Sequence, residues 1–198
     1  MDALTQQLIQ QLAGEGITQI SRKIGADEQT TKAALSTALP LLVSALAKNT
    51  SKTEGAQSLN QALAKDHDGS ILNDMPAYLE NPAAANGAGI LGHVLGSQQP
   101  VVTKGLTKGT GLNSEQVDQL LQIGAPLLMG LLGQQQQQKG FDPNGLSTYL
   151  GGQQQKAQES DPDLMGTLNT LLDADKDGSA LDDVIGMAAK LFGDKPKS

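Results

Sequence analysis

Cysteine is absent from all 198 residues of this chain. The absence excludes disulfides, thiol catalysis and metal sites built on thiolates. It also fits a reducing compartment, and the segment Met1–Gln7 lacks the basic and long apolar regions of a secretory signal. The sequence therefore predicts a cytoplasmic protein.

Aromatic side chains are scarce as well, since two tyrosines and two phenylalanines make up 2% of the chain and tryptophan is missing. The core has to be built from leucine, isoleucine, valine and alanine, which suits closely packed helices. The longest uninterrupted apolar run, near residues 125–132, is too short to cross a bilayer. We therefore expect no membrane span.

Positive charge is in deficit, with a formal net charge of -7 and an isoelectric point near 4.7. This balance opposes general attraction to nucleic-acid phosphates or anionic membranes. The charge is uneven, because residues 17–52 carry five basic and two acidic side chains, whereas residues 159–198 carry four lysines and nine acids. Nucleic-acid binding is not expected. The helix-turn-helix layout of residues 20–42 nevertheless keeps a DNA-binding regulator as the alternative function.

Apolar residues recur at helical spacing along most of the chain, and no segment alternates with the period of a β-strand. The pattern predicts an all-α fold. Asp27 is a good N-cap for a helix through Ala34, Leu35 and Ala38. Pro40 then either kinks that helix or starts a new one.

A stretch of the sequence recurs 86 residues further on. Residues 25–42 align without gaps on residues 111–128, so that Gly25 matches Gly111 and each copy ends in Pro-Leu-Leu. This similarity predicts two homologous multi-helix repeat units. Chance similarity between amphipathic helices is the alternative.

The predicted organisation follows from these copies. The first unit covers residues 1–80 and the second covers residues 87–152. A C-terminal helix-loop-helix takes residues 160–193, and residues 81–89 are interpreted as a flexible linker. Glutamine runs within residues 134–155 are expected to be solvated helix ends and loops.

An Asp-rich loop between the last two predicted helices has alternating carboxylates followed by Gly178, which is the beginning of a calcium-binding loop pattern. Val184 stands where that pattern needs a bidentate glutamate, so weak or partly hydrated binding is expected. Calcium is the candidate cofactor. The candidate metal ligands are Asp173, Asp175, Asp177, Ser179 through its backbone carbonyl, and Asp183.

A purely structural interpretation of the same loop stays open, because Ser179 and Asp182 have the spacing of a capping box. A shorter acidic segment at residues 66–74 has Ala64 at the first ligand position. There a capped turn is favoured over a metal site.

The two histidines lie 26 residues apart with no third ligand spaced for zinc. His67 is expected to be solvated, and His93, in an apolar glycine-rich helix, to be buried or half-buried. No nucleophile elbow, P-loop or dinucleotide fingerprint is present. We therefore expect no enzyme, although a deep polar pocket around His93 would revive that hypothesis, with Asp66 and Asp68 as its acids.

Several short motifs resemble one bacterial family. They are the acidic segments 66–74 and 175–183, the Ile-Leu-Gly-His-Val-Leu-Gly block at 90–96, and the repeated Pro-Leu-Leu. In order and combination they resemble the bacterial domain of unknown function 937 family over nearly the whole chain. The resemblance implies a bacterial, all-helical protein, and the related YidB-like proteins have a small helical fold of homeodomain-like type. The family has no assigned activity, so it supplies no catalytic residues.

Taken together, the sequence predicts a non-catalytic binding or scaffold protein whose partner is another protein or a second copy of itself.

Overall fold

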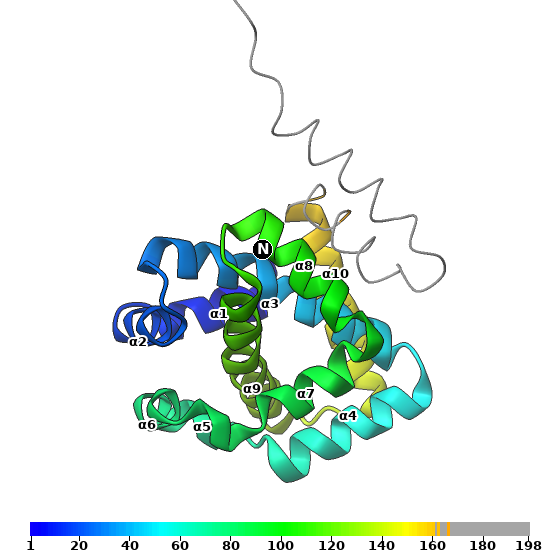
Figure 1. The fold of residues 1–198 in the computed structure, drawn as a ribbon. Helices are drawn as coiled ribbons and strands as arrows, with labels where there is room; N and C mark the ends of the chain where they lie inside the picture. The colour runs from blue at the N-terminus through cyan, green and yellow to red at the C-terminus, as the bar shows by residue number, and fades with distance from the viewer. Residues whose placement is uncertain (161, 163–165, 167–198) are drawn as a thin grey trace, which may run out of the picture.

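The structure, a computed structural model of the chain, describes residues 1–160, 162 and 166. That part is helical throughout and has no strand, which confirms the all-α prediction (Figure 1). Its elements are α1 (Ala3–Leu12), α2 (Glu15–Ile24), α3 (Glu28–Thr50), α4 (Thr53–Asp66), α5 (Ser70–Asn73), α6 (Met75–Glu80), the 3-10 turn η1 (Pro82–Ala85), α7 (Gly87–Val94), the 3-10 turn η2 (Gly96–Gln98), α8 (Gln99–Thr110), α9 (Ser114–Lys139) and α10 (Pro143–Ser160).

Two long helices, α3 and α9, form the centre of the molecule and pack against each other. Together they supply much of one continuous leucine-rich core, which also takes in Leu4 of α1 and Ala157 of α10. Figure 1 shows α9 passing through the middle of the view with shorter helices on either side. Because both long helices are apolar over much of their circumference, each has to be covered by neighbours on several sides.

Both long helices begin in the same way. The preceding helix ends at a glycine in the left-handed region, Gly25 at φ 68° and Gly111 at φ 77°, where a side chain would be strained. Asp27 then accepts a hydrogen bond from the amide of Thr30 at 2.8 Å, and Asn113 starts α9 in the same manner. Asp27 is therefore the N-cap that the sequence predicted.

A proline lies inside each long helix, Pro40 in α3 and Pro126 in α9. No new helix begins at Pro40, so that interpretation is wrong, and α3 continues through the proline. These features recur 86 residues apart, but common helix starts do not by themselves establish a repeated unit, and the two-unit organisation stays a prediction.

Residues 81–89 are not a flexible linker. They form η1 and the start of α7, where Asn86 adopts φ 51° and its side chain accepts a hydrogen bond from the amide of Gly89 at 3.3 Å. Gly87 packs so closely on the backbone carbonyl of Gln122 in α9 that a Cβ atom would collide with it. The glycine that suggested flexibility is needed for close packing instead.

The glutamine runs are also more than solvated ends. Gln135, Gln136 and Gln153 are buried. The Gln136 side-chain amide donates to the carbonyl oxygen of Asn60 at 3.1 Å, and Gln153 accepts from the amide of Ala3 at 3.0 Å. These side chains join helices that are distant in sequence.

Helix α3 is long and apolar enough to cross a membrane by length and composition, and 72% of its most apolar window is buried within the structure. The expectation of no membrane span was based on the shorter apolar run in α9 and not on this segment. A helix enclosed by other helices needs the same composition, so this property alone does not indicate a span.

Candidate functional site

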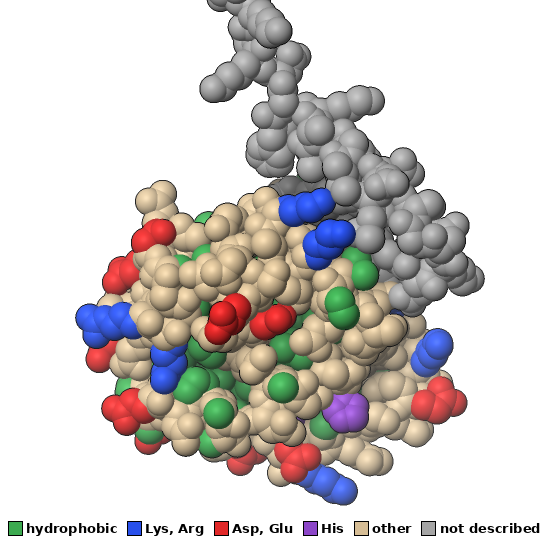
Figure 2. Space-filling view, viewed as in Figure 1, with side chains coloured by type: hydrophobic (Ala, Val, Ile, Leu, Met, Phe, Trp, Pro, Cys, Tyr) green, Lys and Arg blue, Asp and Glu red, His purple; other side chains and the backbone are tan. Residues whose placement is uncertain are grey.

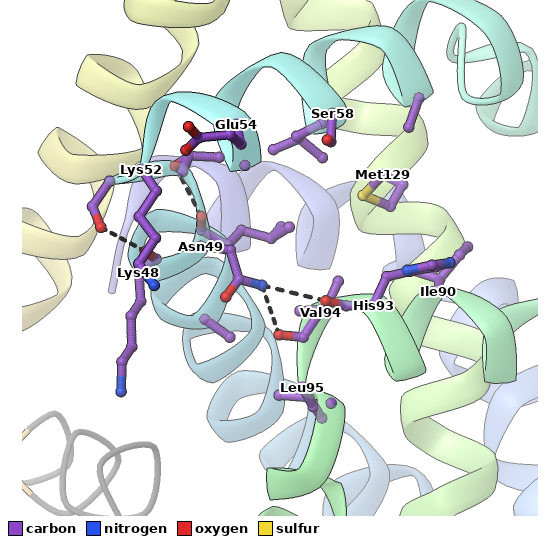
Figure 3. Close-up of a pocket in the computed structure, with 18 of the residues that line it drawn as sticks. Lys48, Asn49, Lys52, Glu54, Ser58, Ile90, His93, Val94, Leu95 and Met129 are labelled. Atoms are coloured by element: carbon purple, nitrogen blue, oxygen red, sulfur yellow. Dashed lines mark hydrogen bonds between the residues drawn. The ribbon is translucent and has the colours of Figure 1, made fainter. Parts of the chain in front are cut away.

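A pocket of about 820 Å³ opens where α3 ends, α4 begins and α7 ends (Figure 3). Its size lies within the range of small-molecule sites. The loop between α3 and α4, the turn η2, and single residues of α9 and of the turn after α4 complete the lining.

The inner wall of the pocket is apolar. Each of its large apolar side chains is buried in the surrounding helices, so the wall is held in place by core packing rather than by loops. These side chains are Leu46, Leu59, Ile90, Val94, Leu95 and Met129.

Hydroxyl groups satisfy the carbonyl oxygens at the end of α3. Thr50 Oγ1 donates to the carbonyl of Leu46 at 2.9 Å, and Ser51 Oγ donates to that of Lys48 at 2.7 Å. Ser147 Oγ of α10 donates to the carbonyl of Thr50 at 2.8 Å. The negative end of α3 is therefore largely occupied by donors from the protein itself.

The side chain of Asn49 fastens α7 to the end of α3. Its amide donates to the carbonyl oxygens of Val94, at 2.9 Å, and of His93, at 3.4 Å. Figure 3 shows both bonds beside the pocket. They fix the distance between two of its walls.

Charged side chains are concentrated at one end of the pocket. In Figure 3, Lys48 and Lys52 lie at one end together with Glu54, whereas Ile90 and Met129 lie at the other. Lys52 is the N-cap residue of α4 and provides no side-chain acceptor for the first amides of that helix. Among the described residues, this end of the pocket therefore combines two lysines, one carboxylate and the first amides of α4.

Both histidines line this pocket, although they are far apart in sequence. His67 is half-buried rather than solvated, and burial lowers its pKa, an effect partly opposed by the negative charge of Asp66. His93 is exposed, contrary to the expectation of a buried or half-buried side chain. Sequence spacing missed their common pocket because it depends on how α4 and α7 pack.

The first acidic segment forms a capped turn. Asp68 Oδ1 accepts from the amide of Ser70 at 2.9 Å, and hydrogen bonding from Ser70 lowers the pKa of that carboxyl. Asp74 Oδ1 caps α6 by accepting from the amide of Ala77 at 3.3 Å. Asp68 therefore has a structural role, and within the described residues no group of three or more His, Asp or Glu side chains is placed to hold a metal ion.

The predicted calcium ligands, which are Asp173, Asp175, Asp177, Ser179 and Asp183, lie outside the described residues. So do the boundaries of the predicted C-terminal helix-loop-helix beyond residue 166. Calcium binding stays a prediction from the sequence.

The basic residues considered for DNA contact, Arg22, Lys23 and Lys32, are exposed. Lys23 Nζ donates to the carbonyl oxygen of Glu80 at 2.9 Å, a contact that links α2 to the end of α6. Figure 2 shows basic and acidic side chains interspersed over the visible face rather than gathered by sign. This arrangement gives little support to the DNA-binding alternative.

Fold and pocket together define a class: an all-helical protein built on two long central helices, with a preformed, largely apolar pocket beside their neighbours. More narrowly, the chain belongs to the family described as Bacterial protein of unknown function (DUF937), which matches residues 6–135. The described residues that line the pocket all fall inside that range. No curated protein and no solved structure matches the chain.

Proposed function

We propose that the protein is a non-catalytic binding protein and that the pocket between α3, α4 and α7 holds a small molecule. The observation that carries this proposal is the pocket itself: about 820 Å³, with an apolar wall set in the core and a polar rim. A preformed apolar cavity with a few polar groups at its opening is the usual form of a small-molecule site.

The polar groups of the pocket favour binding over catalysis. Among the described residues that line the pocket, Glu54 carries the carboxylate. No hydrogen bond within the described part of the chain joins it to His67 or His93. A histidine acting as a general base is normally oriented by such a partner. His93 contributes its backbone carbonyl to the structure by accepting from Asn49.

The test is a fluorescence titration of the full chain with N-phenyl-1-naphthylamine, a neutral apolar dye that brightens in apolar surroundings. Ser58 is exposed, lines the pocket and lies on α4. Ser58→Trp should obstruct the opening and reduce dye binding at least about tenfold, because a large ring would occupy the ligand space. The matched control is Gln57→Trp, which adds the same ring at the neighbouring exposed position outside the lining.

Equal binding by both tryptophan variants and the unmodified chain, with unchanged melting temperatures, would refute the pocket as the binding place. Absence of any dye binding to the unmodified chain would refute the proposal as a whole.

A second part of the proposal is a calcium-stabilised loop at residues 173–183, supported by the alternating carboxylates of the sequence. A cation that binds only the native state at about 100 times its dissociation constant adds roughly 2.7 kcal/mol to its stability. Thermal melts with calcium, magnesium and chelator should therefore differ, and Asp175→Ala should remove the difference. Three identical melts would exclude the site.

We also infer that residues 1–80 and 87–152 are two copies of one unit that together form the binding scaffold. Support comes from the glycine that precedes each long helix, the side-chain N-cap and the internal proline, which recur at the same offset. Separate expression of the two segments tests this, because each copy should then retain helical structure. Failure of one segment to form any helix would contradict it.

A further inference from the structure

A thioether and two imidazoles line the same pocket, and together they form a set of soft metal ligands. Met129 of α9, His93 of α7 and His67, which follows α4, all belong to the lining. We propose that these three side chains bind a soft monovalent metal ion, copper(I), at the end of the pocket where Met129 lies. The inference goes beyond the proposed function, because the ion occupies one end of the pocket and leaves the rest to an organic ligand.

Helix α7 brings His93 to Met129. Gly87, at the start of α7, packs on the carbonyl of Gln122 in α9, and Met129 lies about two helical turns after Gln122. Figure 3 shows the His93 side chain beside Ile90 and Met129. The hydrogen bond that His93 makes within the described residues involves its backbone carbonyl, so its ring nitrogens are available as ligands.

The capped turn after α4 brings His67 to the same helix. Its carbonyl lies so close to Gly133 that a Cβ atom there would collide with it. Gly133 comes one helical turn after Met129, so the two residues lie on the same face of α9. His67 is half-buried and lines the pocket. The two histidines therefore approach the same part of α9 from two different segments.

The chemistry of these ligands selects the ion. Thioether sulfur and imidazole nitrogen suit copper(I), whereas calcium and magnesium take oxygen ligands. Within the described residues, carboxylates and imidazoles alone form no group of three that could hold a metal ion, so the sulfur of Met129 is the necessary third ligand. Glu54, a carboxylate of the lining, lies at the other end of the pocket in Figure 3.

Neutral ligands also favour a single charge on the ion. Met129 and Ile90 are only 5% and 8% exposed, so the ion enters apolar surroundings, where an uncompensated charge is costly. With neutral ligands a divalent ion brings two uncompensated charges, and a monovalent ion brings one. His93 is exposed, which gives the ion a path from solvent.

The test is a competition for copper(I) between the full chain and the coloured chelate of copper(I) with bicinchoninate, under excess ascorbate and without oxygen. The unmodified chain should withdraw one copper(I) ion per molecule. Silver(I), a redox-inert ion of the same charge, should shift the NMR signals of both imidazoles, which are identifiable because the chain contains two histidines. Zinc should bind at least about tenfold more weakly than copper(I).

Met129→Leu removes the sulfur and nearly conserves the side-chain volume, so the fold should persist. Its affinity for copper(I) should fall at least about tenfold, since even the loss of outer-shell partners has effects of that size. The matched control is Met75→Leu, which makes the same change at a half-buried methionine outside the lining. His93→Gln should weaken binding in the same way, and its exposed position keeps this result independent of core packing.

The outcomes separate this inference from the proposed function. Copper(I) affinity that Met129→Leu and Met75→Leu change equally, imidazole signals that silver(I) leaves unshifted, or zinc binding as tight as that of copper(I) each overturns the metal site. Dye binding that Ser58→Trp blocks, without any uptake of copper(I), overturns the metal site and leaves the proposed function. Uptake of copper(I) that depends on Met129, without any dye binding, supports the metal site and refutes the proposed function.

Discussion

Helices α3 and α9 begin alike and contain a proline at corresponding positions, yet α9 has glycine at several positions where α3 has a larger residue. At three positions related by the same offset of 86 residues, α3 has side chains with a Cβ atom and α9 has glycine. The pairs are Ala38 and Gly124, Ser44 and Gly130, and Ala47 and Gly133. All six residues are buried.

The missing Cβ atoms of α9 let other parts of the chain lie directly on that helix. A Cβ at Gly133 would collide with the carbonyl oxygen of His67, and one at Gly130 would collide with the side chain of Ile71. Gly124 is different, because the nearest atom to its Cβ position is a leucine methyl at 3.6 Å, an ordinary contact. Helix α9 therefore has a lower helix propensity than α3 at these positions, and in return the capped turn packs directly on its backbone.

The largest expected effect comes from giving α9 the residue that α3 has. Gly133→Ala should lower the free energy of unfolding by about 2–3 kcal/mol, since the backbone of the turn has to move away from the helix. Urea denaturation followed by circular dichroism measures it.

The control is Gly151→Ala in α10, where nothing lies within 4 Å of the added atom. There alanine should stabilise by up to about 1 kcal/mol through helix propensity alone. If Gly133→Ala behaved like this control, the close seating of the turn on α9 would be wrong.

A smaller change in the free energy of unfolding, of opposite sign, is expected at Ser44 of α3, the residue that corresponds to Gly130. Ser44 is fully buried, and its hydroxyl has no hydrogen-bond partner. Ser44→Ala should raise the free energy of unfolding by about 1 kcal/mol, because a buried unsatisfied group is removed. Ser36→Ala is the control, since Ser36 Oγ donates to the carbonyl of Lys32 at 2.9 Å, and this change should be near neutral. If Ser44→Ala instead lowered the free energy of unfolding, the Ser44 hydroxyl would have to stabilise the folded state.

The features that the sequence predicted correctly are governed by neighbouring residues. Asp27 caps the helix that follows it, because its side chain accepts a hydrogen bond from the amide of Thr30. The helical spacing of the apolar residues predicted the all-α fold of the described residues. Local hydrogen bonding and helical periodicity suffice for such features.

The features that were missed depend on contacts between distant segments. The pocket draws on α3, α4, α7 and α9, and no local pattern shows which of their faces meet. Gln136 was interpreted as solvated because glutamine is polar, yet it is buried against Asn60. Gly87 suggested a flexible segment, but a glycine also permits the closest packing, and sequence alone does not distinguish the two.

The N-caps of the two long helices can also be compared, because the side chain of Asp27 is ionisable and that of Asn113 is not. Asn113 and Gln116 form a capping box, and Gln116 also donates to the carbonyl of Gly25 at 2.9 Å. Asn113→Ala should cost about 1 kcal/mol at any pH. Hydrogen bonding from Thr30 lowers the pKa of Asp27 below its usual 3.8. The stabilisation that this cap provides is therefore present above that pH, and it is lost as the pH falls through the lower folded-state pKa.

Denaturation of Asp27→Asn and Asn113→Ala between pH 2.5 and 7 separates the two caps. Asp27→Asn should flatten the acid limb of the stability curve, whereas Asn113→Ala should shift the whole curve downward. Parallel curves of stability against pH for the two variants would contradict the assignment of Asp27 as the ionisable cap.

The smallest expected effect concerns His67, whose carbonyl lies on α9 while its side chain lines the pocket beside the end of α3. Burial lowers the folded-state pKa of this imidazole below 6.5, so the unfolded chain binds a proton more readily. Stability should therefore be complete above about pH 6.5 and should decline as the pH falls from there through the folded pKa. His67→Gln removes the titrating group and leaves the backbone carbonyl on Gly133, so its stability should change less between pH 7 and pH 5 than that of the unmodified chain. Urea midpoints at half-unit pH intervals measure the difference, and equal slopes for the two chains would mean that the His67 ring is as well solvated in the folded state as in the unfolded one.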